Sequence, residues 1–161
     1  RSGRVNSMAF VYQQLMGASE FSRLPFDDFM RGIIMYHQSS GATTASREIE
    51  RTERLDHVVV DLETAVPLGL VVHEIVAKMY SHGVPASGKP VFTLELIGTD
   101  GMLRLSFNDN GNGIPARCQD GTGFLLVRAL CSQISAELTI LSPVDEAGGT
   151  SVTVAVPIPA R

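Results

Sequence analysis

A carboxylate followed by two spaced glycines, at the end of an alternating strand pattern, is the feature that most constrains how this chain folds. Segment 109–113 reads Asp-Asn-Gly-Asn-Gly, and residues 102–108 before it alternate apolar and polar side chains, as in a strand with one buried face. A second glycine pair, Gly121 and Gly123, then opens a helical pattern. Glycines beside a carboxylate at a strand end let a ligand approach the backbone. The arrangement therefore suits a nucleotide pocket, although a simple strand and turn has the same pattern.

Helical periodicity predicts amphipathic helices, because apolar residues recur every three or four positions. Asp27 and Asp28 lie in the first turn of one of them, where the helix dipole favours acids. Gly83 and Pro85 end the longest one. The first has no capping residue before it, so we expect that helix to begin upstream of residue 1. The predicted ranges are 5–16, 26–34, 67–82 and 123–135.

Alternating segments predict short strands, and an organisational boundary falls near residues 39–46, where the pattern changes from helical to extended. A Gly-Thr-Asp-Gly turn at 98–101 is typical of a hairpin. Together, the predicted helices and strands indicate an α+β fold, a sandwich with helices on one face of a mixed, mostly antiparallel sheet. The predicted strands are 47–52, 58–61, 91–97, 102–107, 137–141 and 150–156.

Composition excludes several classes of function. Apolar residues make up 44% of the 161 residues and charged residues 19%, as in a globular protein. The net charge of −4 argues against nucleic acid or an anionic membrane as a partner, and no apolar run reaches membrane-spanning length. Cys118 and Cys131 have neither metal-site nor disulfide-framework spacing. With no signal-peptide pattern, we expect a cytoplasmic chain with no metal ligands among its cysteines.

These segments together resemble the motifs of the GHKL ATPases. Residues 68–82 are similar to the N box, 109–113 to the first glycine box and 121–127 to the second. Residues 148–150, Gly-Gly-Thr, are similar to the closing motif before the last strand. The motifs occur in the order of the family. The resemblance implies a GHKL ATP-binding catalytic domain over 45–161, with the Bergerat-type two-layer α/β sandwich.

Finer details resemble bacterial sensor histidine kinases of the second HisKA-type and HWE subgroup. These details are the Pro-Leu-Gly-Leu phrase at 67–70, the short stretch between the glycine boxes, and residues 4–9. The resemblance implies that residues 1–40 are a remnant of the dimerisation helices and linker, forming a homodimer. It also implies that ATP donates its γ-phosphoryl group to a histidine outside this chain, and that a response regulator is the downstream partner.

The resemblance assigns roles around the adenine. Asp109 matches the residue that accepts a hydrogen bond from the adenine amino group; a turn aspartate is the alternative. Gly111 and Gly113 match the glycines that let the backbone approach the nucleotide; an ordinary loop has the same geometry. Thr150 matches a hydroxyl that holds adenine, directly or through water. A β-branched strand residue explains Thr150 equally well.

Other roles concern the phosphates and the reacting group. Gly121 and Gly123 precede a helix whose amino end offers free N–H groups to phosphate oxygens, although a tight turn into a core helix is the alternative. Glu74 matches the N-box glutamate that orients or activates a reacting group. Lys78 lies one turn away, so an ordinary ion pair is the competing interpretation of Glu74.

The N box departs from the family pattern at two positions. His73 replaces its first asparagine and Lys78 its second, the residue that binds the Mg²⁺ bridging the phosphates. A lysine has no acceptor atom for a metal, and its ammonium repels one. We therefore expect nucleotide binding that is weakened or independent of Mg²⁺, with Lys78 neutralising phosphate charge. His73 is either a neutral acceptor in the pocket or a packed helix residue.

Two alternatives remain at this stage. Residues 114–120, between the glycine boxes, form a very short lid with a single cation, Arg117. Together with Lys78 and His73, this short lid is also compatible with a pseudokinase or phosphotransfer scaffold that no longer uses ATP. An anti-sigma-type serine kinase shares the fold as well. The predicted dimerisation helix argues against that last alternative.

Overall fold

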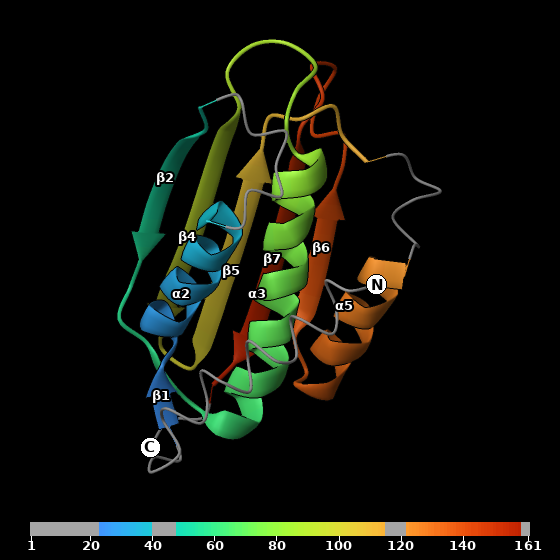
Figure 1. Ribbon diagram of the computed structural model, residues 1–161. Coiled ribbons are helices and arrows are strands. Elements are labelled where there is room, and N and C mark those ends of the chain that lie inside the picture. Colours follow the sequence, from blue (N-terminus) through green and yellow to red (C-terminus); the bar gives the residue numbers. More distant parts are fainter. Residues whose placement is uncertain (1–22, 40–47, 115–121, 159–161) are drawn as a thin grey trace.

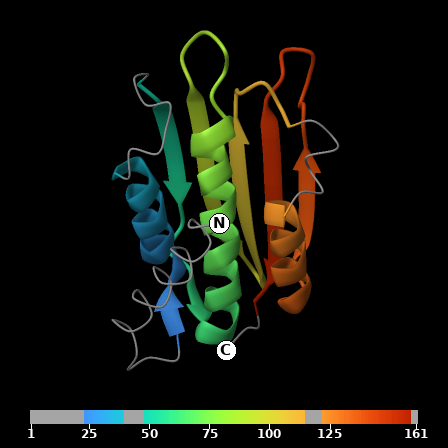
Figure 2. The ribbon, with the colours of Figure 1, turned by 45° about the vertical axis from the view of Figure 1, so that its right-hand side comes forward.

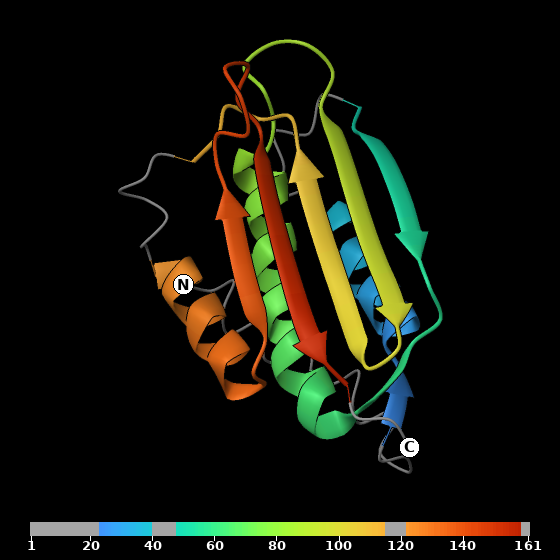
Figure 3. The same cartoon turned by 180° about the vertical axis from the view of Figure 1, so that it is seen from behind.

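A five-stranded sheet covered on one face by helices forms the body of the protein (Figure 1). The computed structural model describes residues 23–39, 48–114 and 122–158. Within these residues, the three helices lie side by side over the same face of the sheet (Figure 2). Seen from behind, the opposite face of the sheet carries no helix of the described chain (Figure 3). This arrangement confirms the predicted two-layer α+β sandwich.

The strands run in the order β2-β4-β5-β7-β6, and β1 pairs with β3 in a separate small sheet. Only β2 and β4 are parallel among the described pairs; the others are antiparallel. The elements are β1 (Arg23–Pro25), α2 (Phe26–Ser39), β2 (Glu50–Leu55), β3 (Val59–Asp61), α3 (Leu62–His82), β4 (Val91–Thr99), β5 (Met102–Asp109), α5 (Thr122–Gln133), β6 (Glu137–Leu141) and β7 (Thr150–Pro157). The predicted helix 5–16 lies outside the described residues.

The sheet follows from the alternation in the sequence. In β4 and β5 every second residue is buried, and the two strands form the predicted hairpin, with Thr99 opposite Met102. Gly101 in the turn has φ +76°, a left-handed conformation that glycine adopts without a steric penalty. The register of β5 against β7 then places Asp109 opposite Thr150. The pairing of β5 with β7 thus places two predicted site residues next to each other.

Helix α3 begins earlier than the sequence pattern predicts. Its first residue is Leu62, and Pro67, expected at the start, is buried inside the helix. A proline there removes one helical hydrogen bond. Ala65 and Leu68 flank it and are fully buried, so core packing holds this turn in the helix. The expected start at residue 67 is therefore wrong.

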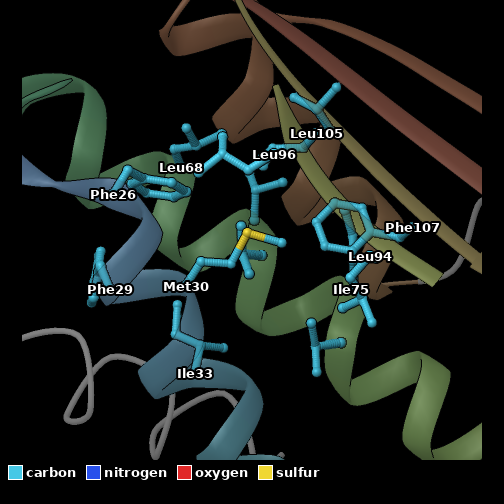
Figure 4. Close-up of a cluster of buried hydrophobic side chains, with 14 of the residues drawn as sticks. Phe26, Phe29, Met30, Ile33, Leu68, Ile75, Leu94, Leu96, Leu105 and Phe107 are labelled. Atoms are coloured by element: carbon cyan, nitrogen blue, oxygen red, sulfur yellow. The ribbon is translucent and has the colours of Figure 1, made fainter. Parts of the chain in front are cut away.

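Helix α2 shares its core with α3 and the sheet. Figure 4 shows Met30 and Ile33 of α2, Leu68 and Ile75 of α3, and Leu94 of β4 gathered in one buried cluster. All five side chains are at most 2% exposed. The described part of range 1–40 therefore belongs to the same packed sandwich as the rest of the chain. No helix among the described residues is long and apolar enough to cross a membrane.

Candidate functional site

A pocket opens between α3 and the sheet, at the end of β5. It combines apolar side chains with one carboxylate, one hydroxyl and two basic side chains. The lining residues come from the end of α3, from β5 and the residues after it, from α5 and from β7. They are Ile75, Lys78, Met79, His82, Gly83, Phe107, Asp109, Ile114, Phe124, Thr150 and Val152. Three of the predicted site residues, Lys78, Asp109 and Thr150, are thus brought together.

Asp109 supplies the acceptor of the pocket. Its Oδ1 accepts a hydrogen bond from the Gly111 N–H at 2.9 Å. Burial raises the pKa of this carboxyl to about 6, while hydrogen bonds from the backbone of Gly111 and Thr150 oppose the rise. At pH 7 the group is therefore mostly ionised, and a half-buried carboxylate needs donors. It is suited to accept a hydrogen bond from an amino group of a ligand.

Glycines allow three backbone segments to meet beside Asp109. A Cβ added at Gly111 would lie 2.7 Å from the carbonyl carbon of Gly83, at the end of α3. A Cβ at Gly83 would lie 2.7 Å from Asp109 Oδ2. The Gly149 N–H donates to the Gly111 carbonyl at 2.7 Å, which ties the closing Gly-Gly-Thr segment to the first glycine box. No other residue fits at Gly83 or Gly111 without displacing a neighbour.

Two of the remaining predicted glycines, Gly113 and Gly123, lie at the edges of this site. Gly113 has φ +88° and packs near Pro143. Gly123 lies in the first turn of α5, whose Phe124 lines the pocket. Gly121 lies outside the described residues.

Thr150 is 6% exposed and bonds to a residue that the motifs did not identify. Its Oγ1 lies 2.7 Å from the Oγ of Ser142, which follows β6. The same Oγ accepts a hydrogen bond from the Ile114 N–H at 2.6 Å. In the sequence, Ser142 is a hydroxyl residue directly after a predicted strand, a feature too common to identify a site residue by itself.

Lys78 points into the pocket. Its Nζ lies over the ring of Phe124, 5.1 Å from the ring centroid, in a cation–π arrangement. Its place in the lining puts an ammonium where the resemblance places a magnesium ligand. Among the described residues, no ion pair joins Lys78 to Glu74, the pair that was the competing interpretation of Glu74. Glu74 is half-buried on α3 and does not line the pocket.

His73 lies on the other side of α3. It is 2% exposed and faces α2, where its Nδ1 lies 3.1 Å from the Nε2 of His37. Burial lowers the pKa of both imidazoles to about 4, so both are neutral at pH 7. The structure does not bring His73 to the pocket; of its two expected roles, packing describes its position.

The donor set of the pocket fits a nucleotide base but not a magnesium ion. Apolar walls, a half-buried carboxylate and a hydroxyl suit a flat ring with amino and ring-nitrogen atoms. Mg²⁺ needs several oxygen ligands in octahedral geometry. The lining offers one carboxylate, and Lys78 adds a positive charge. Elsewhere in the described chain, no group of three His, Cys, Asp or Glu side chains is placed to hold a metal.

Several solved structures that are similar to this chain are histidine kinases. No protein-family model and no curated protein matches the sequence. The structure is similar to the histidine kinase domain of the blue-light activated histidine kinase of Erythrobacter litoralis EL346, with a TM-score of 0.80 and 26% identity, over 98% of this chain and 74% of that one. A longer chain of that kinase matches with a TM-score of 0.78 and 26% identity, over 96% of this chain and 47% of its own length.

The fold also matches more distant structures. The mycobacterial sensor histidine kinase MprB has a TM-score of 0.67 at 14% identity, over 86% of this chain and 99% of that one. At that identity the likeness concerns the fold alone. This chain spans about half the length of the longer blue-light kinase chain that it matches.

Proposed function

We propose that this chain, which has the fold of a histidine kinase catalytic domain, binds ATP in the Asp109 pocket and supplies the γ-phosphoryl group to a histidine outside the chain. The observation that carries the proposal is the half-buried Asp109 carboxylate at the end of β5, enclosed by Gly83 and Gly111. The likeness to histidine kinase domains supports it.

In this proposal the base enters between α3 and the sheet. Its amino group donates to Asp109, and the Thr150 hydroxyl binds a second polar atom of the ring. Ile75, Met79 and Val152 supply apolar contacts for the ring faces. The amino group distinguishes adenine from guanine, which has a carbonyl at the same place. That carbonyl would face the carboxylate as a second acceptor, so the pocket should select ATP over GTP.

The phosphates are proposed to lie toward the start of α5. Gly123 is at that end, Gly121 comes just before it in the sequence, and the first N–H groups of a helix favour anions. Lys78 would neutralise phosphate charge from α3, in place of a metal at this position. This assignment agrees with a donor set that does not fit Mg²⁺.

Phosphoryl transfer depends on positioning and charge neutralisation more than on a strong nucleophile. A nitrogen of the acceptor imidazole would bond to the γ-phosphorus while the bond to the bridging oxygen breaks and ADP leaves. Glu74 is proposed to orient the reacting group. The proposed enzyme is thus a protein histidine kinase whose rate is limited by the unusual Lys78.

The wider assembly is also a proposal. Because α2 shares the core of the sandwich, we place the start of the catalytic domain at or before Arg23. The preceding segment, with its predicted helix 5–16, would belong to the dimerisation helices and pair with a second copy. A response regulator would take the phosphoryl group from the acceptor histidine. ATP as the donor places the reaction in the cytoplasm.

The test is a titration with ATP and with GTP, on the wild-type chain and on Asp109→Asn. The wild-type chain should bind ATP at least about tenfold more tightly than GTP, as expected from one charge-assisted hydrogen bond. The asparagine variant should lose this preference, because its amide offers both a donor and an acceptor. Equal affinity of the wild-type chain for both nucleotides would contradict the assignment of Asp109.

A further inference from the structure

Ser142 connects two parts of the pocket wall without lining the pocket. It lies directly after β6, and its Oγ accepts a hydrogen bond from the Ile114 N–H at 2.6 Å. The same atom lies 2.7 Å from Thr150 Oγ1 and 3.4 Å from the Gly149 carbonyl oxygen. Ile114 and Thr150 both line the pocket. One hydroxyl therefore holds both the start of the segment between the glycine boxes and the proposed base-binding hydroxyl.

The hydrogen bond between Ser142 and Thr150 can form in either direction. A hydroxyl has one hydrogen to donate and two lone pairs, and Ile114 occupies one of those lone pairs. Ser142 can direct its hydrogen to Thr150 at 2.7 Å or to Gly149 at 3.4 Å. At 2.7 Å the contact between the two hydroxyls is a strong hydrogen bond whichever of them donates. Where Thr150 donates to Ser142, the hydrogen of Ser142 goes to Gly149; where Ser142 donates to Thr150, the hydrogen of Thr150 is available to a ligand.

We propose that Ser142 is a positioning residue of the nucleotide pocket: with a base bound, it donates to Thr150 and so holds the Thr150 hydroxyl as a donor toward a ring nitrogen of the base. This inference rests on the proposed ATP binding. It adds a specificity element, since every unsubstituted ring nitrogen of adenine is an acceptor. Asp109 would receive the amino hydrogen while Thr150 donates to the ring, so the two residues would recognise complementary groups of one base.

The test is a double-mutant cycle read by ATP affinity. Ser142→Ala should weaken ATP binding by about three- to tenfold, the usual effect of one lost hydrogen bond. In a Thr150→Val background, which has no hydroxyl to orient, the same change should weaken binding by less than about twofold. Ser142→Thr keeps the hydroxyl and should restore most of the affinity. Ser151→Ala, next to Thr150 on β7, is the matched control and should bind as the wild type does.

Each variant is first shown to be folded by urea unfolding. If Ser142→Ala does not fold, Ser142→Cys takes its place, because a thiol is similar in size and a weak hydrogen-bond donor. A wild-type affinity in Ser142→Ala, or an equal loss in both backgrounds, would overturn the role of Ser142 while leaving ATP binding intact. A wild-type chain that binds no nucleotide would overturn the proposed function, and this role with it.

Discussion

His37 and His73 form a buried pair that joins α2 to α3. The Nε2 atom of His37 lies 3.1 Å from the Nδ1 atom of His73, between residues 36 positions apart in the sequence. The His37 ring is also near Tyr80, in a stacked arrangement with centroids 6.3 Å apart. One imidazole donates and the other accepts, so the accepting ring must be neutral; with both pKa values lowered to about 4, both rings are neutral at pH 7. The histidine at the first N-box position thus serves packing between the helices.

This pair predicts a loss of stability in acid. The pKa of each imidazole falls from 6.5 to about 4 on folding, so the unfolded chain binds more protons between these values. As far as this pair determines it, the free energy of unfolding should therefore be highest above pH 6.5 and should decrease as the pH falls toward 4. The limiting slope is ~1.4 kcal/mol per pH unit for each proton bound. Urea unfolding at a series of pH values measures it.

Protonation of Asp109 changes the free energy of unfolding in the opposite direction, so this group needs its own control. Its folded-state pKa is raised to about 6, so the folded chain binds more protons than the unfolded one below that pH, and this group favours folding as the pH falls. The series is therefore run in an Asp109→Asn background. There, the double change His37→Leu with His73→Leu should flatten the pH dependence between 4 and 6.5. An unchanged slope would exclude the pair as its source.

Nucleotide affinity should also depend on pH through Asp109. Accepting a hydrogen bond from an amino group requires the ionised carboxylate, and its pKa is raised to about 6. ATP affinity should thus fall as the pH drops through 6, by up to about tenfold per pH unit below it. Because ATP itself titrates in this range, the readout is the ratio of wild-type to Asp109→Asn affinity. A ratio that stays constant from pH 5 to pH 8 would contradict the prediction.

Replacing Lys78 by asparagine should make the ATP affinity depend on Mg²⁺. Lys78→Asn removes the ammonium from the pocket and supplies an amide oxygen, so Mg²⁺ should raise the ATP affinity of this variant by about tenfold or more, or ~1.4 kcal/mol. ATP affinity without Mg²⁺ should fall in the same variant, because a phosphate-neutralising charge is lost. Lys89→Asn, an exposed lysine paired with Glu50, is the control and should change neither value. No gain from Mg²⁺ in Lys78→Asn would refute the metal-excluding role.

The contact between Gly83 and Gly111 predicts a sensitive position. A methyl group at residue 111 would lie 2.7 Å from the Gly83 carbonyl carbon, and backbone on both sides leaves little room to relax. Gly111→Ala should lower the free energy of unfolding by about 1–3 kcal/mol and weaken ATP binding. Gly88→Ala has φ +90° but open space around it, so it should cost only about 1–2 kcal/mol and leave affinity unchanged. Equal effects of both variants on affinity would disprove the special role of Gly111.

Local patterns in the sequence predicted most of the elements. The alternation in β4 and β5 and the helical periodicity of α2 and α5 predicted elements that the structure confirms, with ends shifted by a few residues. The start of α3 was predicted wrongly, because proline is a strong local signal while the packing of Ala65 is a tertiary effect. Pairing of β2 with β4 in parallel also depends on the whole sheet.

In the site, too, local motifs are visible in the sequence while contacts between distant segments are not. Asp109 and the glycines of 109–113 belong to one strand end, and Thr150 belongs to the Gly-Gly-Thr motif at 148–150; a sequence shows both motifs directly. His37, which contacts His73, is on another helix, and Ser142, which contacts Thr150, follows another strand; neither contact has a sequence pattern. Side-chain contacts between distant segments are thus the part that only the folded structure provides.

The first measurement to make is a calorimetric titration of the wild-type chain with ATP, with and without Mg²⁺. We expect saturable binding of one ATP per chain, with an affinity that Mg²⁺ does not increase, because Lys78 lies where the metal would be held. A non-hydrolysable analogue should bind in the same way. A folded sample that binds neither nucleotide would contradict the assignment of the Asp109 pocket as an ATP site.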